Sequence, residues 1–192
     1  MPTSPFDRIL VIAATRAELA AGGDWLTECC GVGPVDAAAA AACAIANHRP
    51  AAVVHVGIAG ARRASSLRPR DLVIGTESLY CDLDVPERFA PRRLVTSTAL
   101  VAAAGRALPA AARCAIGTSG RVGGTTGCDV EAMEGFAVLR AAALAGVPAI
   151  EVRAIANAIE EADRARWRFD EAFAAIVTAT PSLVREIAAC VT

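Results

Sequence analysis

Short apolar runs alternate along the chain with longer alanine-rich or amphipathic stretches, an order typical of α/β proteins. The apolar runs predict strands over residues 8–15, 26–30, 52–57, 71–80, 93–96, 113–118 and 149–156. Helical periodicity predicts helices over residues 35–47, 99–108, 130–145 and 169–190, the last with a break or kink at Pro181. Small residues from Gly57 to Gly60 predict a tight turn after the third strand. No repeat or linker interrupts the pattern, so we expect a single domain over residues 1–192.

The composition excludes several classes of protein. The chain has 192 residues, of which 55% are hydrophobic and 20% charged, with a formal net charge of −1. A chain this long and this apolar can bury a core without disulfide or metal staples, and it is too apolar to be disordered. Because no basic excess exists to neutralise phosphates, we expect no nucleic-acid partner. Seven cysteines without a CxxC pair predict neither a zinc site nor a disulfide framework.

The sequence also gives no membrane or cofactor signal. No run reaches the roughly 18 consecutive apolar residues of a membrane span, and the first eight residues lack the basic start of a signal peptide. We therefore expect a cytoplasmic protein with no membrane partner. Gly31 and Gly33 before a helix imitate a dinucleotide motif, but the next strand ends without the acidic residue that a ribose hydroxyl requires. The expectation is no cofactor and no metal.

Polar or glycine residues follow four of the predicted strands, where ligands bind in open α/β sheets. They are Glu18; the run Gly57, Ile58, Ala59 and Gly60; the group Glu131, Met133 and Glu134; and Asn157. Each one alone also fits a structural role, such as an acidic residue at a helix start or a turn residue. His55, inside an apolar run, is interpreted as a core histidine rather than a catalyst.

The joint order of these motifs resembles the nucleoside phosphorylase and nucleosidase superfamily. The resemblance extends from Ile9 to about Asn157, and it is strongest for VEAMEG at residues 130–135 and VRAIAN at residues 152–157. The GIAGA run at residues 57–61 and the Tyr-x-Asp-x-Asp segment at residues 80–84 support it. The family fold implies a three-layer domain, in which helices flank a central mixed and twisted sheet.

The resemblance implies a role for each motif. Glu134 matches the glutamate that grips both ribose hydroxyls, and Met133 matches the methionine beneath the sugar, with Glu131 beside them in the substrate-binding group. Glu18 matches the glutamate that activates water in the hydrolytic branch. Asn157 stands where the family contacts purine N7. The residues Gly57, Ile58, Ala59 and Gly60 lie against the ribose or the nucleophile.

The predictions of the reaction type and of the purine base depend on only a few residues. Ile58 stands where phosphate-using relatives often have a polar contact, so Glu18 favours water as nucleophile, although Arg16 could still reach an anion. The neutral amide of Asn157 can meet both N7 and O6 of a 6-oxopurine, and the chain is similar to futalosine hydrolases, which release hypoxanthine. The alternatives are a methylthioadenosine or adenosylhomocysteine nucleosidase, a purine nucleoside phosphorylase, and a non-catalytic nucleoside-binding domain.

Three segments depart from the family pattern. Residues 20–27 and 118–130 are shorter than in relatives, and Ala156 replaces the usual serine. These differences leave the ribose end unchanged and affect the base pocket. The resemblance further implies a homodimer that binds a small purine nucleoside.

Overall fold

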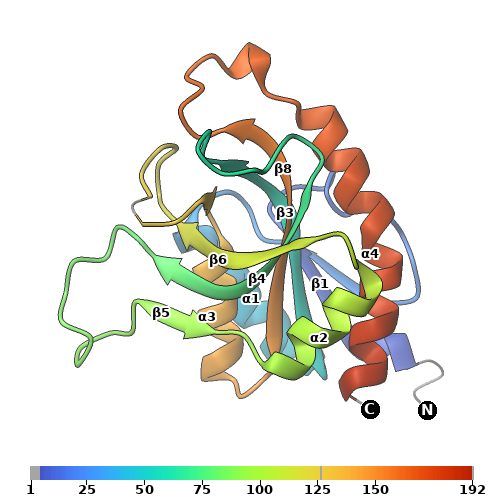
Figure 1. Cartoon of the computed structure of the whole chain (residues 1–192). Helices are drawn as coiled ribbons and strands as arrows, with labels where there is room; N and C mark the ends of the chain where they lie inside the picture. The colour runs from blue at the N-terminus through green and yellow to red at the C-terminus, as the bar shows by residue number, and fades with distance from the viewer. Residues whose placement is uncertain (1–4, 126, 192) are drawn as a thin grey trace.

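The computed structural model describes residues 5–125 and 127–191, in which a mixed sheet carries helices on both faces (Figure 1). The strands are β1 (Ile9–Ala13), β2 (Leu26–Cys29), β3 (Ala52–Ala61), β4 (Leu72–Tyr80), β5 (Arg93–Val95), β6 (Ala112–Thr118), β7 (Val130–Ala132) and β8 (Ala149–Ala158). The helices are α1 (Pro34–His48), α2 (Thr98–Ala107), α3 (Gly135–Leu144) and α4 (Phe169–Val191), with short 3-10 helices η1 (Pro5–Arg8) and η2 (Arg164–Arg166). The predicted α/β class is confirmed.

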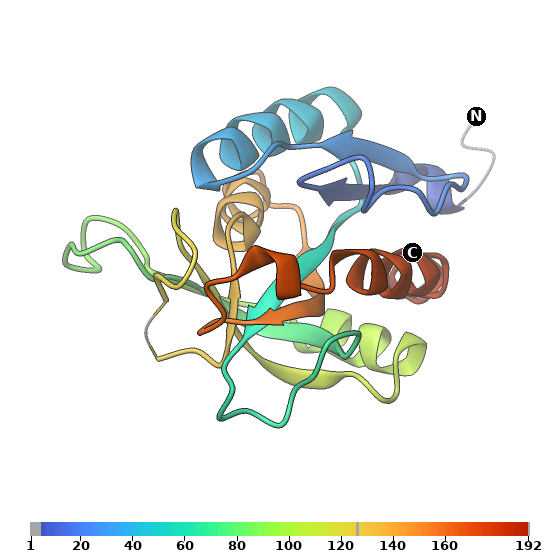
Figure 2. The ribbon, with the colours of Figure 1, turned by 90° about the horizontal axis from the view of Figure 1, so that it is seen from above.

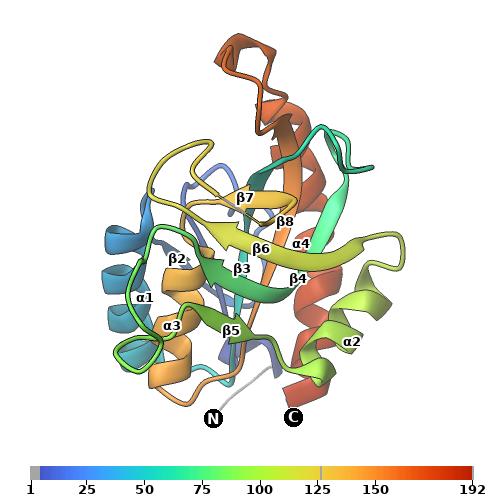
Figure 3. The same ribbon diagram turned by 60° about the vertical axis from the view of Figure 1, so that its left-hand side comes forward.

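The strand order places β3 and β8 at the centre of the molecule. The sheet runs β2-β1-β3-β7-β6-β4-β5, and β8 pairs with both β3 and β4. Strand β3 is parallel to β1 and β8 but antiparallel to β7, and β8 is antiparallel to β4. Since β4 also pairs with β6, and β6 with β7, the strands β3, β8, β4, β6 and β7 close into a ring (Figure 3).

Three apolar clusters hold the layers together. One packs α2 and α4 against the sheet, and it includes Val152 and Leu183. A second packs α1 and α3 against β1 and β3 on the other face, as the view from above shows (Figure 2). A third, which includes Ala59 and Ile155, joins strands of the ring. The expected arrangement of a sheet between two helical layers is therefore present.

Two predicted boundaries are wrong because strand pairing overrides the local pattern. The segment from Gly57 to Gly60 is not a turn: β3 continues through it to Ala61, since β7 and β8 extend the ladder on both sides. The helix predicted from residue 130 starts only at Gly135, because residues 130–132 form β7 between β3 and β6. A strand therefore occupies the first part of the VEAMEG motif.

Helix α4 crosses the whole second face of the sheet. It continues through Pro181 from Phe169 to Val191, so the break expected there is absent. By length and composition alone α4 would suffice to cross a membrane, with 39% of its most apolar window buried inside the protein. Its residues Ile176, Leu183 and Ile187 are fully buried in the first cluster, as expected for a core helix.

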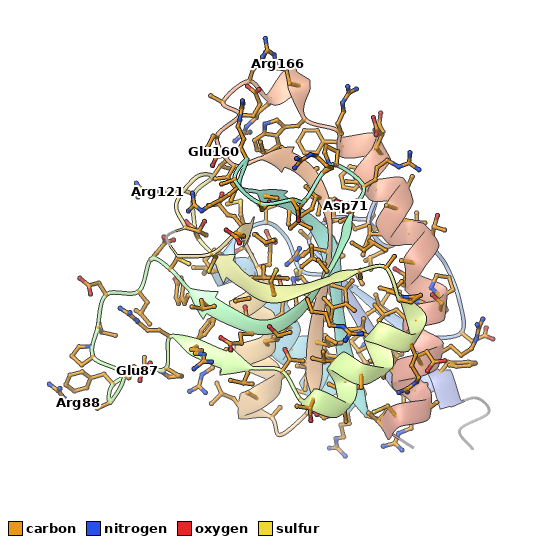
Figure 4. The ribbon with its side chains drawn as sticks, in the orientation of Figure 1. Asp71, Glu87, Arg88, Arg121, Glu160 and Arg166 are labelled. Atoms are coloured by element: carbon orange, nitrogen blue, oxygen red, sulfur yellow. The ribbon has the colours of Figure 1, made fainter. Side chains whose placement is uncertain are left out.

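Charged side chains gather on the loops around the sheet. Figure 4 shows Glu87 and Arg88 at the tip of the loop between β4 and β5, with Arg121 after β6 and Arg166 before α4, all pointing outward. Burial of an unpaired charge is unfavourable, so charges inside the fold need partners. Four of the buried charged groups, Glu18, Glu134, Glu151 and Arg153, lie near the inner part of β8, whereas Glu131 is bonded to the loop after β6.

Candidate active site

Arg153 of β8 is the centre of a buried polar cluster. Its side chain is only 1% exposed, and each of its nitrogens faces a partner. Nε donates to Oε1 of Glu151 at 2.8 Å, and Nη2 lies against Nε2 of His55. Nη1 is 3.6 Å from Oε2 of Glu134. The guanidinium thus joins β8, β3 and the start of α3.

Arg153 and its neighbours shift one another's pKa values. Burial opposes the charged form of Arg153, but the carboxylates of Glu151 and Glu134 outweigh it and raise the guanidinium pKa. Burial also raises the pKa of Glu151, against the opposing effect of Arg153. Burial and the charge of Arg153 together hold the pKa of His55 well below its usual value. His55 is therefore neutral beside a permanent cation.

Glu18 lies in a turn that follows β1, and its side chain is buried. Oε2 accepts from the backbone N–H of Thr15 at 2.7 Å and from the Thr15 hydroxyl at 2.8 Å. Oε1 accepts from the backbone N–H of Ile58 in β3 at 3.2 Å. These bonds attach the carboxylate of Glu18 to the middle of β3, far from it in sequence.

Glu134 is the N-cap residue of α3, and it is also buried. Its Oε1 accepts from the backbone N–H of Gly33 at 3.1 Å, and its Oε2 faces Arg153. Gly33 has a positive φ of 95°, a conformation that glycine adopts without strain. The glycine pair that imitated a dinucleotide motif therefore positions Glu134.

Two glycines of β3 mark two ends of the candidate site. Gly57 is in register with Arg153, and a Cβ on it would come within 3.0 Å of Oε1 of Glu18 and collide with Nη1 of Arg153. Gly60 is in register with Asn157 of β8, and a Cβ on it would lie 3.0 Å from the Asn157 amide. The two positions are three residue steps apart along the strand, which is about 10 Å.

Asn157 is placed beside Gly60 rather than against the arginine cluster. Its Nδ2 donates to the carbonyl of Ala158 at 2.9 Å, and its side chain is largely buried. A cavity of about 330 Å³ lies beside it, lined also by Ala61, Leu67 and Arg168. Glu134 therefore faces the guanidinium of Arg153, and Glu18 approaches the same guanidinium beside Gly57, while Asn157 stands further along the same pair of strands.

The other predicted site residues hold the surrounding structure. Both oxygens of Glu131 accept from the loop after β6: Oε1 from the N–H of Gly123 at 2.6 Å, and Oε2 from the N–H and hydroxyl of Thr125 at 2.8 Å. Glu131 is also in register with Gly60. Met133 is half-buried just before Glu134, and Ala59 packs into the third apolar cluster.

Arg153 and Glu151 are not among the functional residues predicted from the sequence, and His55 is predicted to lie in the core. A signal for the first two exists: opposite charges stand two residues apart, on one face of an otherwise apolar strand. The assignment of His55 to the interior is confirmed, since it is fully buried. Its contact with Arg153 joins strands far apart in sequence, which no local pattern reveals.

The cluster can bind a polyhydroxylated ligand and stabilise positive charge. The carboxylates of Glu18 and Glu134 both lie near the same cation, Arg153, so negative charge predominates beside Gly57. Buried carboxylates act strongly on nearby charge because little water screens them. Within residues 5–125 and 127–191, no group of three or more His, Cys, Asp or Glu side chains is arranged to hold a metal ion.

Known proteins similar to the chain include nucleosidases. Futalosine hydrolase from Streptomyces coelicolor is 51% identical over 57 residues, which are 30% of this chain and 24% of that protein. The structure of Helicobacter pylori futalosine hydrolase matches with a TM-score of 0.82 and 16% identity, covering 93% of this chain and 97% of the other.

Two further structures extend the similarity in fold. Neisseria meningitidis 5′-methylthioadenosine/S-adenosylhomocysteine nucleosidase, in complex with methylthio-immucillin-A, has a TM-score of 0.77 and 23% identity over 93% of this chain and 97% of that one. Streptococcus pyogenes S-adenosylhomocysteine nucleosidase has a TM-score of 0.81 and 21% identity, over 94% and 96%. The family model of the phosphorylase superfamily matches residues 13–189. The chain therefore belongs to the phosphorylase superfamily.

Proposed function

We propose that the protein is a purine nucleoside N-ribosyl hydrolase, with futalosine as the leading substrate. The observation that carries the proposal is that Glu134 faces Arg153 and that Glu18 and Arg153 both border the space beside Gly57, with Asn157 further along the same strands. A sugar would lie at the Gly57 end and a purine at the Gly60 end. The match to the Streptomyces coelicolor futalosine hydrolase supports this choice of substrate.

Glu134 is suited to hold the cis-diol of a ribose. A carboxylate offers about four acceptor positions, two on each oxygen. The Gly33 N–H uses one position on Oε1, and Arg153 faces one on Oε2. Each oxygen keeps one position for a ribose hydroxyl, so the two hydroxyls can donate side by side.

Glu18 is suited to act as the general base. Three donors from Thr15 and Ile58 occupy three of its four acceptor positions, two on Oε2 and one on Oε1. The remaining position is on Oε1, the atom nearest Gly57. A water molecule bound there would give its proton to Glu18 as its oxygen attacks the anomeric carbon. Positioned proton transfer contributes about 10²–10⁴-fold to a rate.

The base would leave on the side of Asn157. Cleavage of the glycosidic bond builds positive charge on the sugar and negative charge on the purine. The bond to Ala158 directs one N–H of Asn157 away from the ligand and leaves its oxygen and second N–H. The N–H would donate to O6 of hypoxanthine, over which the negative charge of the departing base is delocalised, and the oxygen would accept from N7–H once the base has taken up a proton from solvent water.

Water is favoured over phosphate as the nucleophile. The side chain of Ile58, next to Glu18, offers no hydroxyl to an anion, and two carboxylates at the sugar end repel one. Arg16, the other candidate anion ligand, is exposed on the turn before Glu18. The phosphorylase alternative therefore requires an anion to approach against negative charge.

A nucleoside panel tests the proposal and its alternatives. The protein is incubated with futalosine, inosine, methylthioadenosine and adenosylhomocysteine, with and without phosphate, and the released bases are separated by chromatography. Hypoxanthine released from futalosine without phosphate supports the proposal and a place in menaquinone biosynthesis. Adenine release would indicate the methylthioadenosine alternative, phosphate dependence a phosphorylase, and binding without base release a non-catalytic domain.

The substitution Glu18→Gln tests the role of Glu18 as the general base. The amide keeps the size of the side chain but cannot take the proton of water, so we expect kcat to fall by about 10²–10⁴-fold. Nucleoside affinity, measured by calorimetry, should stay within about threefold, since Glu18 contributes mainly to the transition state. An equal loss of affinity and turnover would assign Glu18 a structural role.

We also propose that the protein is a cytoplasmic homodimer. All seven cysteines lie in the described residues, and none of them forms a disulfide there, as is usual in a reducing compartment. An apolar groove of about 500 Å³ lies between α1 and α3, lined by residues such as Ile45, Ala141 and Val147. Leu144 at its border is 72% exposed. A second copy of the chain would cover this surface.

A further inference from the structure

Two buried groups next to Arg153 have no role in the reaction proposed above. His55 of β3 and Glu151 of β8 are both fully buried. Their side chains bond to Ile12, Ser78 and Arg153 rather than to Glu18, Glu134 or Asn157, the residues that would hold the water, sugar and base. Burial of such groups is unfavourable without good partners, so their presence needs an explanation.

The hydrogen-bonding pattern around His55 is directional. Nδ1 lies 3.0 Å from the carbonyl oxygen of Ile12, which can only accept, so Nδ1 carries the ring proton. Nε2 faces Nη2 of Arg153, which can only donate, so Nε2 presents its lone pair. Both contacts are satisfied together only by the neutral ring in this one tautomer. The imidazole thus connects the backbone of β1 to one arm of the guanidinium.

Glu151 holds the opposite side of the same guanidinium. Its Oε1 accepts from Nε of Arg153 at 2.8 Å, and its Oε2 accepts from the hydroxyl of Ser78 in β4 at 3.3 Å. The start of α3 packs directly on this carboxylate, since a Cβ on Gly135 would collide with both of its oxygens. Contacts from β4 and α3 therefore leave Glu151 little freedom to rotate.

We propose that His55 and Glu151 are positioning residues, which clamp Arg153 so that its remaining nitrogen, Nη1, is directed at Glu134 and Gly57. The guanidinium is planar, so fixing Nε and Nη2 also fixes the direction of Nη1. Nη1 would then orient Glu134 toward the ribose and help hold the water beside Glu18. The catalytic consequence of this inference rests on the proposed hydrolysis. The clamping of Arg153 by His55 and Glu151 does not depend on that function.

Two substitutions of His55 separate positioning from simple packing. Gln in place of His55 puts an amide oxygen where Nε2 lies, and so keeps an acceptor for Arg153. Asn at the same position reaches only as far as Nδ1, and so loses that acceptor. Glu151→Gln removes the charge on the other side of the guanidinium and leaves Nε only a weaker, neutral acceptor in place of the charge-assisted bond. His48, the other histidine of the chain, is exposed on the last turn of α1, and His48→Gln is the matched control.

The kinetic experiment compares kcat and KM for the nucleoside that the wild-type protein cleaves. We expect H55N and E151Q to lower kcat by about tenfold or more, because a misplaced group near the reacting atoms costs that much or more. H55Q should recover most of the loss, KM should change by less than about threefold, and H48Q should match the wild type. Folded H55N and E151Q with wild-type kcat would overturn the proposal.

A second measurement does not depend on activity. Nitrogen chemical shifts of the two histidines, assigned with H48Q and H55Q, report the protonation of each ring nitrogen at pH 7 without substrate. The clamp requires His55 to carry its proton on Nδ1 alone, and a proton on Nε2 would overturn it. If the wild type cleaves no nucleoside, the proposed function fails while this measurement still decides whether His55 faces Arg153. If H55N does not fold, E151Q provides the kinetic test.

Discussion

At the scale of single residues, the candidate site depends on how a few buried charges are compensated. Glu18 and Glu134 are each fixed by backbone N–H groups from distant segments, Ile58 and Gly33 respectively. Such bonds place a carboxylate accurately while leaving it acceptor positions for a ligand. Arg153 completes the arrangement as the cation between them, and His55 is the neighbour whose charge state depends on pH.

The lowered pKa of His55 predicts a pH-dependent stability. In the unfolded chain the imidazole titrates near its ordinary value of 6.5, whereas burial and the charge of Arg153 lower its pKa in the fold. Below pH 6.5 the unfolded state therefore binds a proton that the folded state refuses. The stabilising contribution of the neutral, buried His55 to the free energy of unfolding is therefore present above pH 6.5. This contribution is lost as the pH falls, by up to about 1.4 kcal/mol per pH unit.

The measurement is urea unfolding of the wild-type protein and of H55Q between pH 7.5 and pH 5. The wild type should lose more stability than H55Q over this range. The raised pKa of Glu151 acts in the opposite direction, with stability present at low pH and lost as the pH rises. Because both proteins contain Glu151, its contribution largely cancels in the comparison. Parallel curves for the two proteins would contradict a neutral, buried His55.

At the scale of elements, the site is organised by β3 and β8. The order of strands and helices could be predicted from the sequence, since apolar runs and helical periodicity are local. The continuation of β3 through Gly57 and Gly60 could not, because it depends on pairing with β7 and β8. Glu134 and Asn157 could be found from the sequence because each belongs to a short local motif. The role of Arg153 could not, because its partners come from strands and helices that only the packed structure brings together.

Substitutions at Gly57 and Gly60 should affect different stages of the reaction. A Cβ at Gly57 collides with Arg153, which its partners hold in place. We expect Gly57→Ala to lower kcat by up to about 10²-fold through displacement of that guanidinium. A Cβ at Gly60 approaches the Asn157 amide at 3.0 Å, so Gly60→Ala should mainly raise KM. Steady-state kinetics with futalosine distinguish the two, and similar effects on kcat at both positions would contradict two separate ends of the site.

At the scale of the whole molecule, the two helical layers differ in what they leave exposed. Helices α2 and α4 cover the sheet over the cluster that contains Leu183. The layer of α1 and α3 instead has the apolar groove on its surface, where Leu144 is exposed by 72%. Contiguous exposed apolar surface commonly marks a protein–protein contact. The same two helices begin at the site: Gly33, which donates to Glu134, is the N-cap residue of α1, and Glu134 is the N-cap residue of α3.

The proposed homodimer predicts that a charge at the groove separates the subunits. Leu144→Arg would bring a guanidinium into an apolar contact, where an unpaired charge is costly. We expect sedimentation velocity to show a dimer for the wild type and a monomer for L144R, with thermal unfolding of the variant showing that it remains folded. Ala189→Arg on α4, at an exposed position on the other layer, is the control and should stay dimeric. Because Glu134 begins the helix that ends at Leu144, loss of the dimer in L144R should also weaken nucleoside binding. A monomeric wild type would refute the interface, but it would not affect the proposals for the residues around Arg153.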